Sequence, residues 1–217
     1  MPTVAAIIQA RMGSTRLPGK SLIDIAGQPL LGHVIDRVRA SRHVETLMVA
    51  TTMAEEDQAL VKLANTKGIA SYCGSAEDVL DRYYRAAALG QADIVVRITA
   101  DDPFKDPDVI DLIVGRIKAD SNLDYASHTI APTYPEGLDI EVFRFTALAR
   151  AWREARLQSE REHVTPYIWK HPGLFRVLNV CHGENLSGLR WTLDYEEDLQ
   201  FARAVYARLY QGGIFRM

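Results

Sequence analysis

Alternation between strand-like and helix-like segments constrains this chain more than any other feature of its sequence. A short apolar run at residues 4–8 is typical of a strand buried on both faces, and apolar residues with helical spacing follow at 30–38. Three more pairs of this kind follow before residue 120. Such repetition predicts an α/β fold with a mostly parallel sheet and helices on both faces.

The whole chain can be divided in the same way. The expected strands are residues 4–8, 47–52, 69–73, 93–99, 124–128, 138–145, 175–182 and 190–194. The expected helices are residues 30–38, 54–67, 75–89 (opened by a capping box at Ser75), 109–117, 146–170 and 196–210. Ligands of such sheets lie beyond the carboxyl ends of the strands, so the residues after Ile8, Thr52, Thr99 and Leu193 are the first candidates for a site.

Composition narrows the class of protein. The chain has 217 residues with 25 Lys plus Arg and 28 Asp plus Glu, a formal net charge of −3. We expect one domain over residues 1–217, with an arm around 128–172. The sequence offers no membrane span or signal peptide, and its mild acidity argues against nucleic-acid binding. Cys73 and Cys181 lack metal-site spacing, which predicts buried thiols in a reducing cytoplasm.

The loop after the first strand, residues 9–22, carries the densest chemical signal. Arg11, Arg16 and Lys20 are interleaved there with Gly13 and Ser14. Arginines clamp phosphates, glycine lets the backbone approach a ligand, and a hydroxyl can donate to an oxyanion. The loop therefore predicts a polyphosphate site, and a solvated basic turn is the alternative.

A P-loop is excluded at this position. Five residues separate Gly13 from Gly19 where the pattern requires four, and Pro18 stands where its second glycine should be. A P-loop also runs directly into a helix, whereas here a short extended piece and a turn precede a helix near Pro29.

Two acidic positions follow expected strands. Asp101 and Asp102 come after the strand at 93–99, and Asp194 ends the expected strand at 190–194. Magnesium in phosphate chemistry is held by one or two carboxylates together with phosphate oxygens and water. Solvated turn aspartates are the alternative for the first pair, and a helix N-cap is the alternative for Asp194.

The opening segment resembles a known family. IIQARMGSTRLPGKSLIDIAGQPLLGHVIDR is similar to the start of cytidylyltransferases that activate sugar acids, with the spore coat polysaccharide biosynthesis protein F group the most similar. The likeness continues through GSAEDVLDRYYRAA, VVRITADDPFKDPDVID, YPEGLDIEVF, REHVTPYIWKHP and WTLDYEEDL. The resemblance implies a nucleotide-diphospho-sugar transferase fold and a reaction of CTP with a sugar-acid-like acceptor that releases pyrophosphate.

The resemblance also implies roles for particular residues. Asp101 and Asp194 match the family's metal-binding aspartates, which implies Mg²⁺ as cofactor, while Asp102 stands where relatives carry Glu or Cys and its role stays open. Arg11, Lys20 and Asp101 would be catalytic. The nucleotide-binding residues would be Gln9, Ala10, Arg11, Gly13, Ser14, Arg16, Lys20 and Arg82.

The acceptor site and the assembly have weaker signals. Glu136, Asp139 and Glu141 could line an acceptor pocket or lie on a solvated edge hairpin, and His163 could be a base, an acceptor contact or a structural residue. Relatives dimerise through this part of the chain, which implies a homodimer. The apolar arm would be packed by Trp152, Tyr167, Ile168 and Trp169.

Two other functions fit the same fold class. A sugar-nucleotide-dependent glycosyltransferase would typically carry an Asp-x-Asp motif, which the adjacent Asp101 and Asp102 do not form. A non-catalytic nucleotide-binding scaffold would be expected to have lost the loop cations or the two aspartates, and all of them are present.

Overall fold

The computed structural model describes residues 2–217. Its centre is a seven-stranded sheet in the order β5-β4-β1-β6-β8-β7-β9. The strands are β1 (Val4–Gln9), β4 (Thr46–Thr52), β5 (Ala70–Gly74), β6 (Ile94–Thr99), β7 (Tyr125–Ser127), β8 (Glu141–Arg144) and β9 (Val177–Asn179). Only β8 runs against its neighbours, because it pairs antiparallel with β6 and β7 while the other pairs are parallel. The predicted mostly parallel sheet is confirmed.

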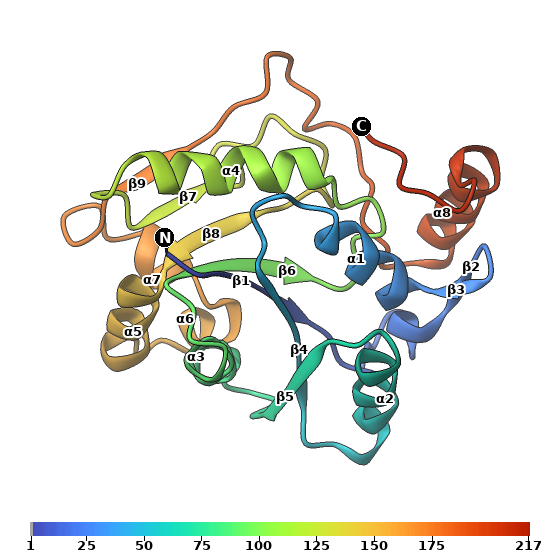
Figure 1. The fold of residues 1–217 in the computed structure, drawn as a ribbon, viewed down its shortest axis with the longest axis horizontal. Helices are drawn as coiled ribbons and strands as arrows, with labels where there is room; N and C mark the ends of the chain where they lie inside the picture. Colours follow the sequence, from blue (N-terminus) through green and yellow to red (C-terminus); the bar gives the residue numbers. More distant parts are fainter. Residues whose placement is uncertain (1) are drawn as a thin grey trace.

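Helices cover both faces of the sheet (Figure 1). On one face, α1 (Leu30–Arg39), α2 (Gln58–Thr66), α4 (Pro107–Ala119) and α8 (Glu196–Leu209) share a core. On the other face lie α3 (Val79–Leu89), α5 (Phe145–Glu154), α6 (Gln158–His163) and α7 (Pro166–Trp169). Short elements complete the chain: a 3₁₀ turn at Lys20–Leu22, the small hairpin β2 (Asp24–Ile25) and β3 (Gln28–Pro29), and a 3₁₀ turn at Glu55–Asp57.

Burial explains why the first strand is continuously apolar. Val4, Ala6 and Ile8 face one core, while Ala5 and Ile7 face the other, and all five are almost completely buried. A strand covered by helices on both sides needs apolar residues at every position. The central position of β1 places its carboxyl end, and the loop that follows, in the middle of the sheet edge.

The second half of the chain differs from the sequence prediction in three places. The strand expected at 138–145 is shorter, because Phe145 already begins α5. The helix expected over 146–170 is three helices, interrupted at Ala155 by an extended backbone and at Val164 by a left-handed one. The predicted aromatic packing of this arm is present, since Trp152, Tyr167 and Trp169 all pack against the second core.

The strand expected at 190–194 is also wrong. Only an isolated bridge joins Arg190 to Glu136 there. Gly137 has a φ of +100°, and a Cβ on it would lie 2.4 Å from the backbone nitrogen of Thr192. The segment therefore lies across a glycine turn rather than in the sheet, and this crossing brings Asp194 to the site.

Two smaller predictions also need correction. Helix α3 starts at Val79, with the carboxylate of Asp78 accepting from the N–H of Asp81 as its N-cap, while the Ser75 hydroxyl accepts from the N–H of Asp78 one turn earlier. The cysteines are not buried, because Cys73 is half-buried and Cys181 is exposed. The sequence pattern alone could not tell which of Ser75 and Asp78 caps this helix.

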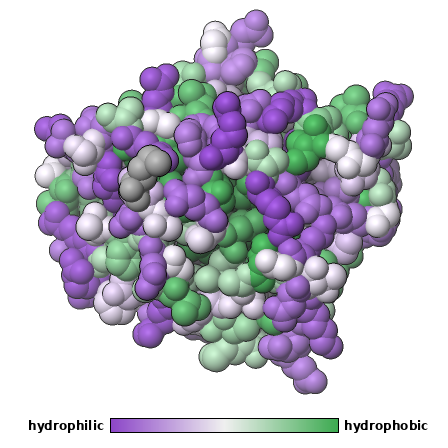
Figure 2. All heavy atoms as spheres, viewed as in Figure 1, coloured by the Kyte–Doolittle hydropathy of each residue, from purple (hydrophilic) through white to green (hydrophobic). Residues whose placement is uncertain are grey.

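The surface in the same orientation is mostly hydrophilic, with hydrophobic residues in smaller groups between polar ones (Figure 2). No helix within residues 2–217 combines the length and the apolar character needed to cross a membrane.

Candidate active site

Lys20 joins two carboxylates that are far apart in the sequence. Its Nζ lies 2.9 Å from Oδ2 of Asp101, in the turn after β6, and 2.8 Å from Oδ1 of Asp194, before α8. It also donates to the carbonyl oxygen of Leu193 at 3.1 Å. The carboxyl ends of β1 and β6 are neighbours in the sheet, so the fold itself brings Lys20 and Asp101 together.

Charge fixes the protonation of this cluster. Burial alone would lower the pKa of Lys20, but the carboxylates of Asp101 and Asp194 outweigh it and raise the pKa above the ordinary value. Burial alone would likewise raise the pKa of Asp101, and the Lys20 ammonium lowers it instead. At neutral pH the lysine is a cation held between two carboxylates.

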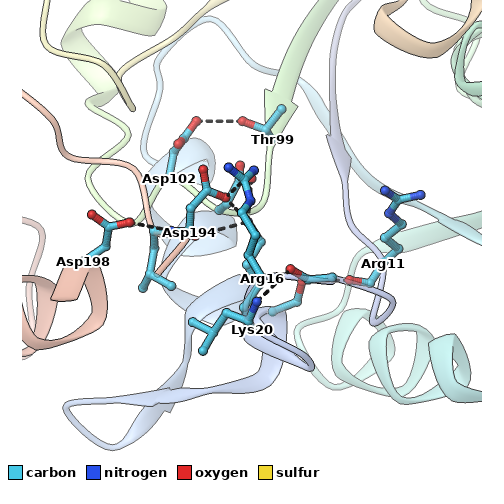
Figure 3. Close-up of polar contacts among 12 residues, drawn as sticks. Arg11, Arg16, Lys20, Thr99, Asp102, Asp194 and Asp198 are labelled. Atoms are coloured by element: carbon cyan, nitrogen blue, oxygen red, sulfur yellow. Dashed lines mark hydrogen bonds and ion pairs between the residues drawn. The ribbon is translucent and has the colours of Figure 1, made fainter. Parts of the chain in front are cut away.

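Two arginines contact Asp194, and Figure 3 shows one of them, Arg16, beside it. Nη2 of Arg16 lies 3.1 Å from Oδ1 of Asp194, and Nη2 of Arg190 lies 3.3 Å from Oδ2. Both guanidinium groups also lie over the ring of Tyr195, at 5.3 and 6.0 Å from its centroid. Three cations therefore contact the Asp194 carboxylate, and their guanidinium and ammonium groups are of the kind that binds phosphate oxygens.

Asp194 is not the cap of α8. The carboxylate of Asp198 accepts from the backbone N–H groups of Asp194 and Tyr195, at 2.8 and 2.9 Å. This leaves the Asp194 side chain directed at the cluster of cations. The N-cap alternative raised by the sequence is therefore wrong for Asp194: Tyr195 holds the N-cap position, and Asp198 in the first turn of α8 makes the capping hydrogen bonds.

The loop after β1 folds around the carbonyl oxygen of Met12. That oxygen accepts from the N–H groups of Ser14 and Gly19, at 2.8 and 3.2 Å. Gly19 has a φ of +70°, in the left-handed region that favours glycine, and it directly precedes Lys20. The hydroxyl of Ser14 accepts from the N–H of Leu17 at 3.3 Å. The loop is thus a compact turn that delivers Lys20 to the carboxylates.

One residue that sequence reasoning missed holds this loop in place. Asp57 is buried, and its carboxylate accepts from the N–H of Met12 at 2.7 Å and from the N–H and hydroxyl of Thr52. Burial opposes ionisation, yet these hydrogen bonds lower the pKa of Asp57. Asp57 is the last of three consecutive acidic residues, and nothing in that sequence indicates that it is buried. Its role is therefore visible only in the structure.

Two cavities meet at the carboxyl ends of the strands. The first, of about 190 Å³, is lined by the loop and the turn after β6, including Ser14, Lys20 and Asp101. The second, of about 470 Å³, extends under α3 and α6. Four residues line both cavities, namely Gln9, Arg11, Arg16 and Asp101.

The nucleotide-site predictions gather at these cavities. All of the predicted nucleotide-binding residues except Gly13 line one or both of them. Gly13 is exposed in the loop itself. The guanidinium of Arg11 points away from the cluster around Lys20 and Asp194 (Figure 3), so the three loop cations do not converge on one point.

Arg82 lies on the floor of the second cavity. It is 1% exposed and donates to the carbonyl oxygen of Ser75 at 2.6 Å, and no carboxylate within residues 2–217 pairs with it. Burial lowers its pKa from the ordinary value. Arg82 is therefore a buried cation at the cavity and not a solvated residue of the helix face.

Asp102 differs from Asp101 in its surroundings. It is buried, accepts from the hydroxyl of Thr99 at 2.6 Å and pairs with the fully buried Lys105 at 2.7 Å. Burial raises its pKa to about 6. This structure gives Asp102 a structural place inside the turn and leaves Asp101 at the cavity; neither is the solvated turn residue of the alternative.

The predicted acceptor residues do not come together. His163 lines the second cavity, whereas Glu136 is exposed and pairs with Arg190 at 2.7 Å. Asp139 lies in the turn after Gly137 and lines neither cavity. Glu141 is buried behind Arg97, with which it forms an ion pair. The hairpin edge therefore supplies no side chain to the two cavities.

The donor set for a divalent cation consists of two carboxylates. Within residues 2–217 no group of three or more His, Cys, Asp or Glu side chains could hold a metal ion. Asp101 and Asp194 both contact the same nitrogen of Lys20, so their oxygens converge. Two carboxylates completed by phosphate oxygens and water are a usual magnesium environment, so these residues fit that ion.

Comparison with known proteins agrees with this geometry. A model of the cytidylyltransferase family matches residues 5–215. The spore coat polysaccharide biosynthesis protein SpsF of Bacillus subtilis (strain 168) is 34% identical over 215 residues, 96% of this chain and 88% of that protein. A 3-deoxy-manno-octulosonate cytidylyltransferase of Anaeromyxobacter sp. (strain Fw109-5) is 40% identical over 117 residues, 52% of this chain and 46% of that protein.

A solved structure extends the agreement to three dimensions. The cytidylyltransferase from Leptospira borgpetersenii serovar Hardjo-bovis (strain JB197) superposes with a TM-score of 0.93 at 31% identity, covering 97% of this chain and 89% of that one. Fold and site therefore define a nucleotidyltransferase. The chain belongs to the cytidylyltransferase family, and the predicted fold and family resemblance are confirmed.

Proposed function

We propose that this protein transfers CMP from CTP to an acceptor related to sugar acids, with release of pyrophosphate, in the synthesis of a surface polysaccharide. The observation that carries the proposal is Lys20, held between Asp101 and Asp194 at the mouth of the smaller cavity. The family supports cytidylyl transfer, and the names of the spore coat and octulosonate relatives support the acceptor class and the process.

The proposed step is an in-line displacement at the α-phosphorus of CTP. An acceptor hydroxyl forms the new P–O bond, its proton passes to solvent or a nearby base, and the bond to the leaving pyrophosphate breaks. Arg11, Arg16 and Lys20 would neutralise the triphosphate, and the Ser14 hydroxyl and free amides of the loop would orient it. Rate enhancement would come from positioning and charge stabilisation.

Asp101 and Asp194 would hold Mg²⁺ when the nucleotide binds. The ion would supply charge stabilisation for the phosphate oxygens. Lys20 already lies between these carboxylates, so the chain itself keeps the two groups close to each other. Arg16 would then exchange its contact with Asp194 for contacts with phosphate oxygens.

The nucleoside would occupy the end of the larger cavity below α3. Arg82 is buried there with unused donors, and Gln9 and Ala10 offer a strand end for the base and ribose. Because Arg82 has no carboxylate partner among the described residues, an acceptor oxygen of the base would satisfy it.

We further propose a cytoplasmic homodimer of single-domain subunits, joined through the arm at 128–172. Within the subunit, Trp152 and Phe145 of the arm stack on Tyr84 of α3, with the Trp152 and Tyr84 ring centroids 4.2 Å apart. A two-fold pair is the commonest assembly of soluble oligomers. Light scattering on the purified protein should give twice the subunit mass.

A pyrophosphate-release screen tests the reaction. The four nucleoside triphosphates are each offered with Mg²⁺ and a panel of 2-keto sugar acids and phosphorylated small acids. We expect release only with CTP and one acceptor class. Calorimetry separates the rival functions: a scaffold binds CTP without turnover, and a glycosyltransferase binds a sugar nucleotide in preference to CTP. Either result would overturn the proposal.

A further inference from the structure

The larger cavity has two ends, and only one of them is needed for a nucleoside. Arg82 and the start of α3 form one end, while Arg97 of β6 and the α6 residues Gln158, Glu162 and His163 form the other. Asp101 lines both this cavity and the smaller one. The α6 end therefore lies beside the site where the acceptor must approach the nucleotide.

Unsatisfied polar atoms concentrate in this cavity. Four buried side-chain polar atoms lack a hydrogen-bond partner within residues 2–217, and three of them belong to the cavity residues Gln9, Arg82 and Arg97. Buried polar groups are almost always paired in folded proteins, because each unpaired one costs about 1–3 kcal/mol. Their grouping at one cavity indicates that a ligand completes them.

Arg97 has unpaired hydrogen-bond donors at the α6 end of the cavity. Its side chain is 16% exposed, and its only hydrogen bond within the described residues runs from Nη1 to Oε2 of Glu141. Nε is buried without a partner. A guanidinium carries five N–H donors in a fork that matches a carboxylate or phosphate, so one edge of this group remains for a ligand.

A network behind Arg97 fixes its orientation. The carboxylate of Glu141 accepts from the hydroxyl of Tyr125 at 2.7 Å and from that of Thr165, besides pairing with Arg97. Burial opposes ionisation of Glu141, but Arg97 and the two hydroxyls lower its pKa. Glu141 thus holds Arg97 through one ion pair and leaves its Nε–H without a partner among the described residues.

The backbone on the other side of this network is strained. Val164 has a φ of +72° and a ψ of −55°, and the N–H of Thr165 donates to the carbonyl oxygen of His163 at 2.9 Å across it. A β-branched residue in such a three-residue turn is rare and costs free energy. The turn directs Thr165 to Glu141 and places His163 at the cavity.

The carboxylates that line the cavity do not pair with its two buried arginines. Glu77 and Glu162 are exposed, whereas Arg82 is 1% exposed and Arg97 is mostly buried. Exposed carboxylates are solvated and screened, while buried cations need a partner nearby. The third acid of the cavity, Asp101, pairs with Lys20, so among the described residues none of the three pairs with Arg82 or Arg97.

We propose that the α6 end of the cavity binds an anionic group of the acceptor, a carboxylate or a phosphate, and that Arg97 is the residue that recognises it. This inference rests on the proposed function for the identity of the acceptor. The proposal assigns acceptor recognition to Arg97 on β6, whereas the sequence analysis assigned it to the hairpin at 134–143. Glu141 becomes a positioning residue that acts through Arg97.

Nuclear magnetic resonance of the arginine Nε–H groups tests the site directly. The Arg97 signal is identified as the one lost in Arg97→Lys, and pyruvate and inorganic phosphate serve as the carboxylate and phosphate probes. We expect this signal to move saturably with at least one probe, and the probe that acts identifies the anion. The signal of Arg144 on β8, which donates to the backbone carbonyls of Leu123 and Ile117, should not move. If neither probe moves the Arg97 signal, or if CTP alone moves it as the probes do, the inference is overturned.

Kinetics give a second readout. With an acceptor found in the screen, Arg97→Lys should raise its KM about tenfold and leave the KM for CTP unchanged, because a lysine cannot reproduce the fork. Arg144→Lys is the matched control, and the double variant Arg97→Gln, Glu141→Gln removes the charges as a pair so that the protein can fold. A folded double variant with the original acceptor KM would contradict the inference. Failure of CTP to bind would instead remove the proposed function and leave the resonance test intact.

Discussion

The carboxylate of Asp57 accepts a hydrogen bond from the backbone N–H of Met12 at 2.7 Å and thereby ties the loop after β1 to the end of β4. The two residues are 45 positions apart, and the same carboxylate also holds Thr52 at the last position of that strand. The loop that carries Arg16 and Lys20 is therefore set by a residue that itself lines neither cavity of the site.

Replacing Asp57 with Asn tests this relationship. One of the bonds to Met12 and Thr52 must fail, because an amide can accept through only one atom. We expect a loss of about 1–3 kcal/mol in the free energy of unfolding and weaker CTP binding. Urea unfolding and calorimetry measure the two effects.

Asp93→Asn is the control for that variant. Asp93 accepts from the N–H of Thr3 at 2.8 Å, at the opposite end of β1 and on the surface. Its replacement should change neither quantity appreciably. Equal effects of the two variants on CTP affinity would show that the bond to Met12 does not order the loop.

Lys20→Met removes the cation between Asp101 and Asp194. The two carboxylates are then left facing each other, so we expect kcat/KM for CTP to fall by about 10²–10³. The unfolding free energy at neutral pH should also fall, and part of it should return on acidification as the carboxylates take up protons.

Lys67→Met provides a matched comparison. Nζ of Lys67 also bridges two acceptors, Asp36 at 2.7 Å and Gln28 at 2.8 Å, but away from the cavities. Its kcat/KM should stay at the wild-type value. A Lys20→Met enzyme with unchanged kcat/KM would remove Lys20 from the reaction.

Asp78 joins α3 to α6 and can be dissected with two variants. It caps α3, and its Oδ2 accepts from Nε and Nη2 of Arg161 at 2.9 and 2.7 Å. Asp78→Asn should keep the cap and weaken the ion pair, while Asp78→Ala should lose both and cost about 1–2 kcal/mol more from the cap. Thermal unfolding ranks the stability of the two variants. An equal loss of stability in both would show that the cap contributes nothing.

We expect Asp111 to cause part of the fall in the free energy of unfolding at acidic pH. It is buried, and although burial opposes ionisation, hydrogen bonds from Arg42, Ser41 and the N–H of His43 lower its pKa below the ordinary 3.8. Because the native pKa is lower than the unfolded one, this stabilisation is fully present above the unfolded value and disappears as the pH falls through the native value.

Asp111→Asn should therefore cost about 1–3 kcal/mol at neutral pH and flatten the pH dependence below about pH 4. Urea unfolding across that range measures both. Glu45→Gln, at an exposed residue of the same loop region, should keep the wild-type slope. An unchanged slope in Asp111→Asn would assign the fall at acidic pH to other carboxylates.

Sequence patterns predicted the parts of this fold that depend on local periodicity. The strands β1, β4, β5 and β6 and the helices between them follow the expected alternation, because each buries a regular apolar face. The loop 9–22 and Asp101 could be found as well, because strand ends in a parallel sheet fix where a ligand lies. The sequence also singled out Asp194 at the end of an expected strand, although that segment crosses a glycine turn instead of joining the sheet. The family resemblance added its match to a metal-binding aspartate.

The rest depends on contacts between distant residues. Nothing local distinguishes Asp57, which is buried against Met12, from the exposed acids beside it. Arg97 looks like one charged residue in an apolar strand, and only the pairing of β6 with β8 places Glu141 behind it. The break at Val164 could not be predicted either, because a valine gives no sign of a left-handed backbone.

The contact between Lys20 and Asp194 also has a consequence for the order of synthesis. Asp194 is synthesised 174 positions after Lys20. Domains acquire structure from the N-terminus as the chain grows. A nascent chain can thus assemble the early strand–helix units and the contact between Lys20 and Asp101 before Asp194 has been made. The complete ion cluster forms only after Asp194 has left the ribosome.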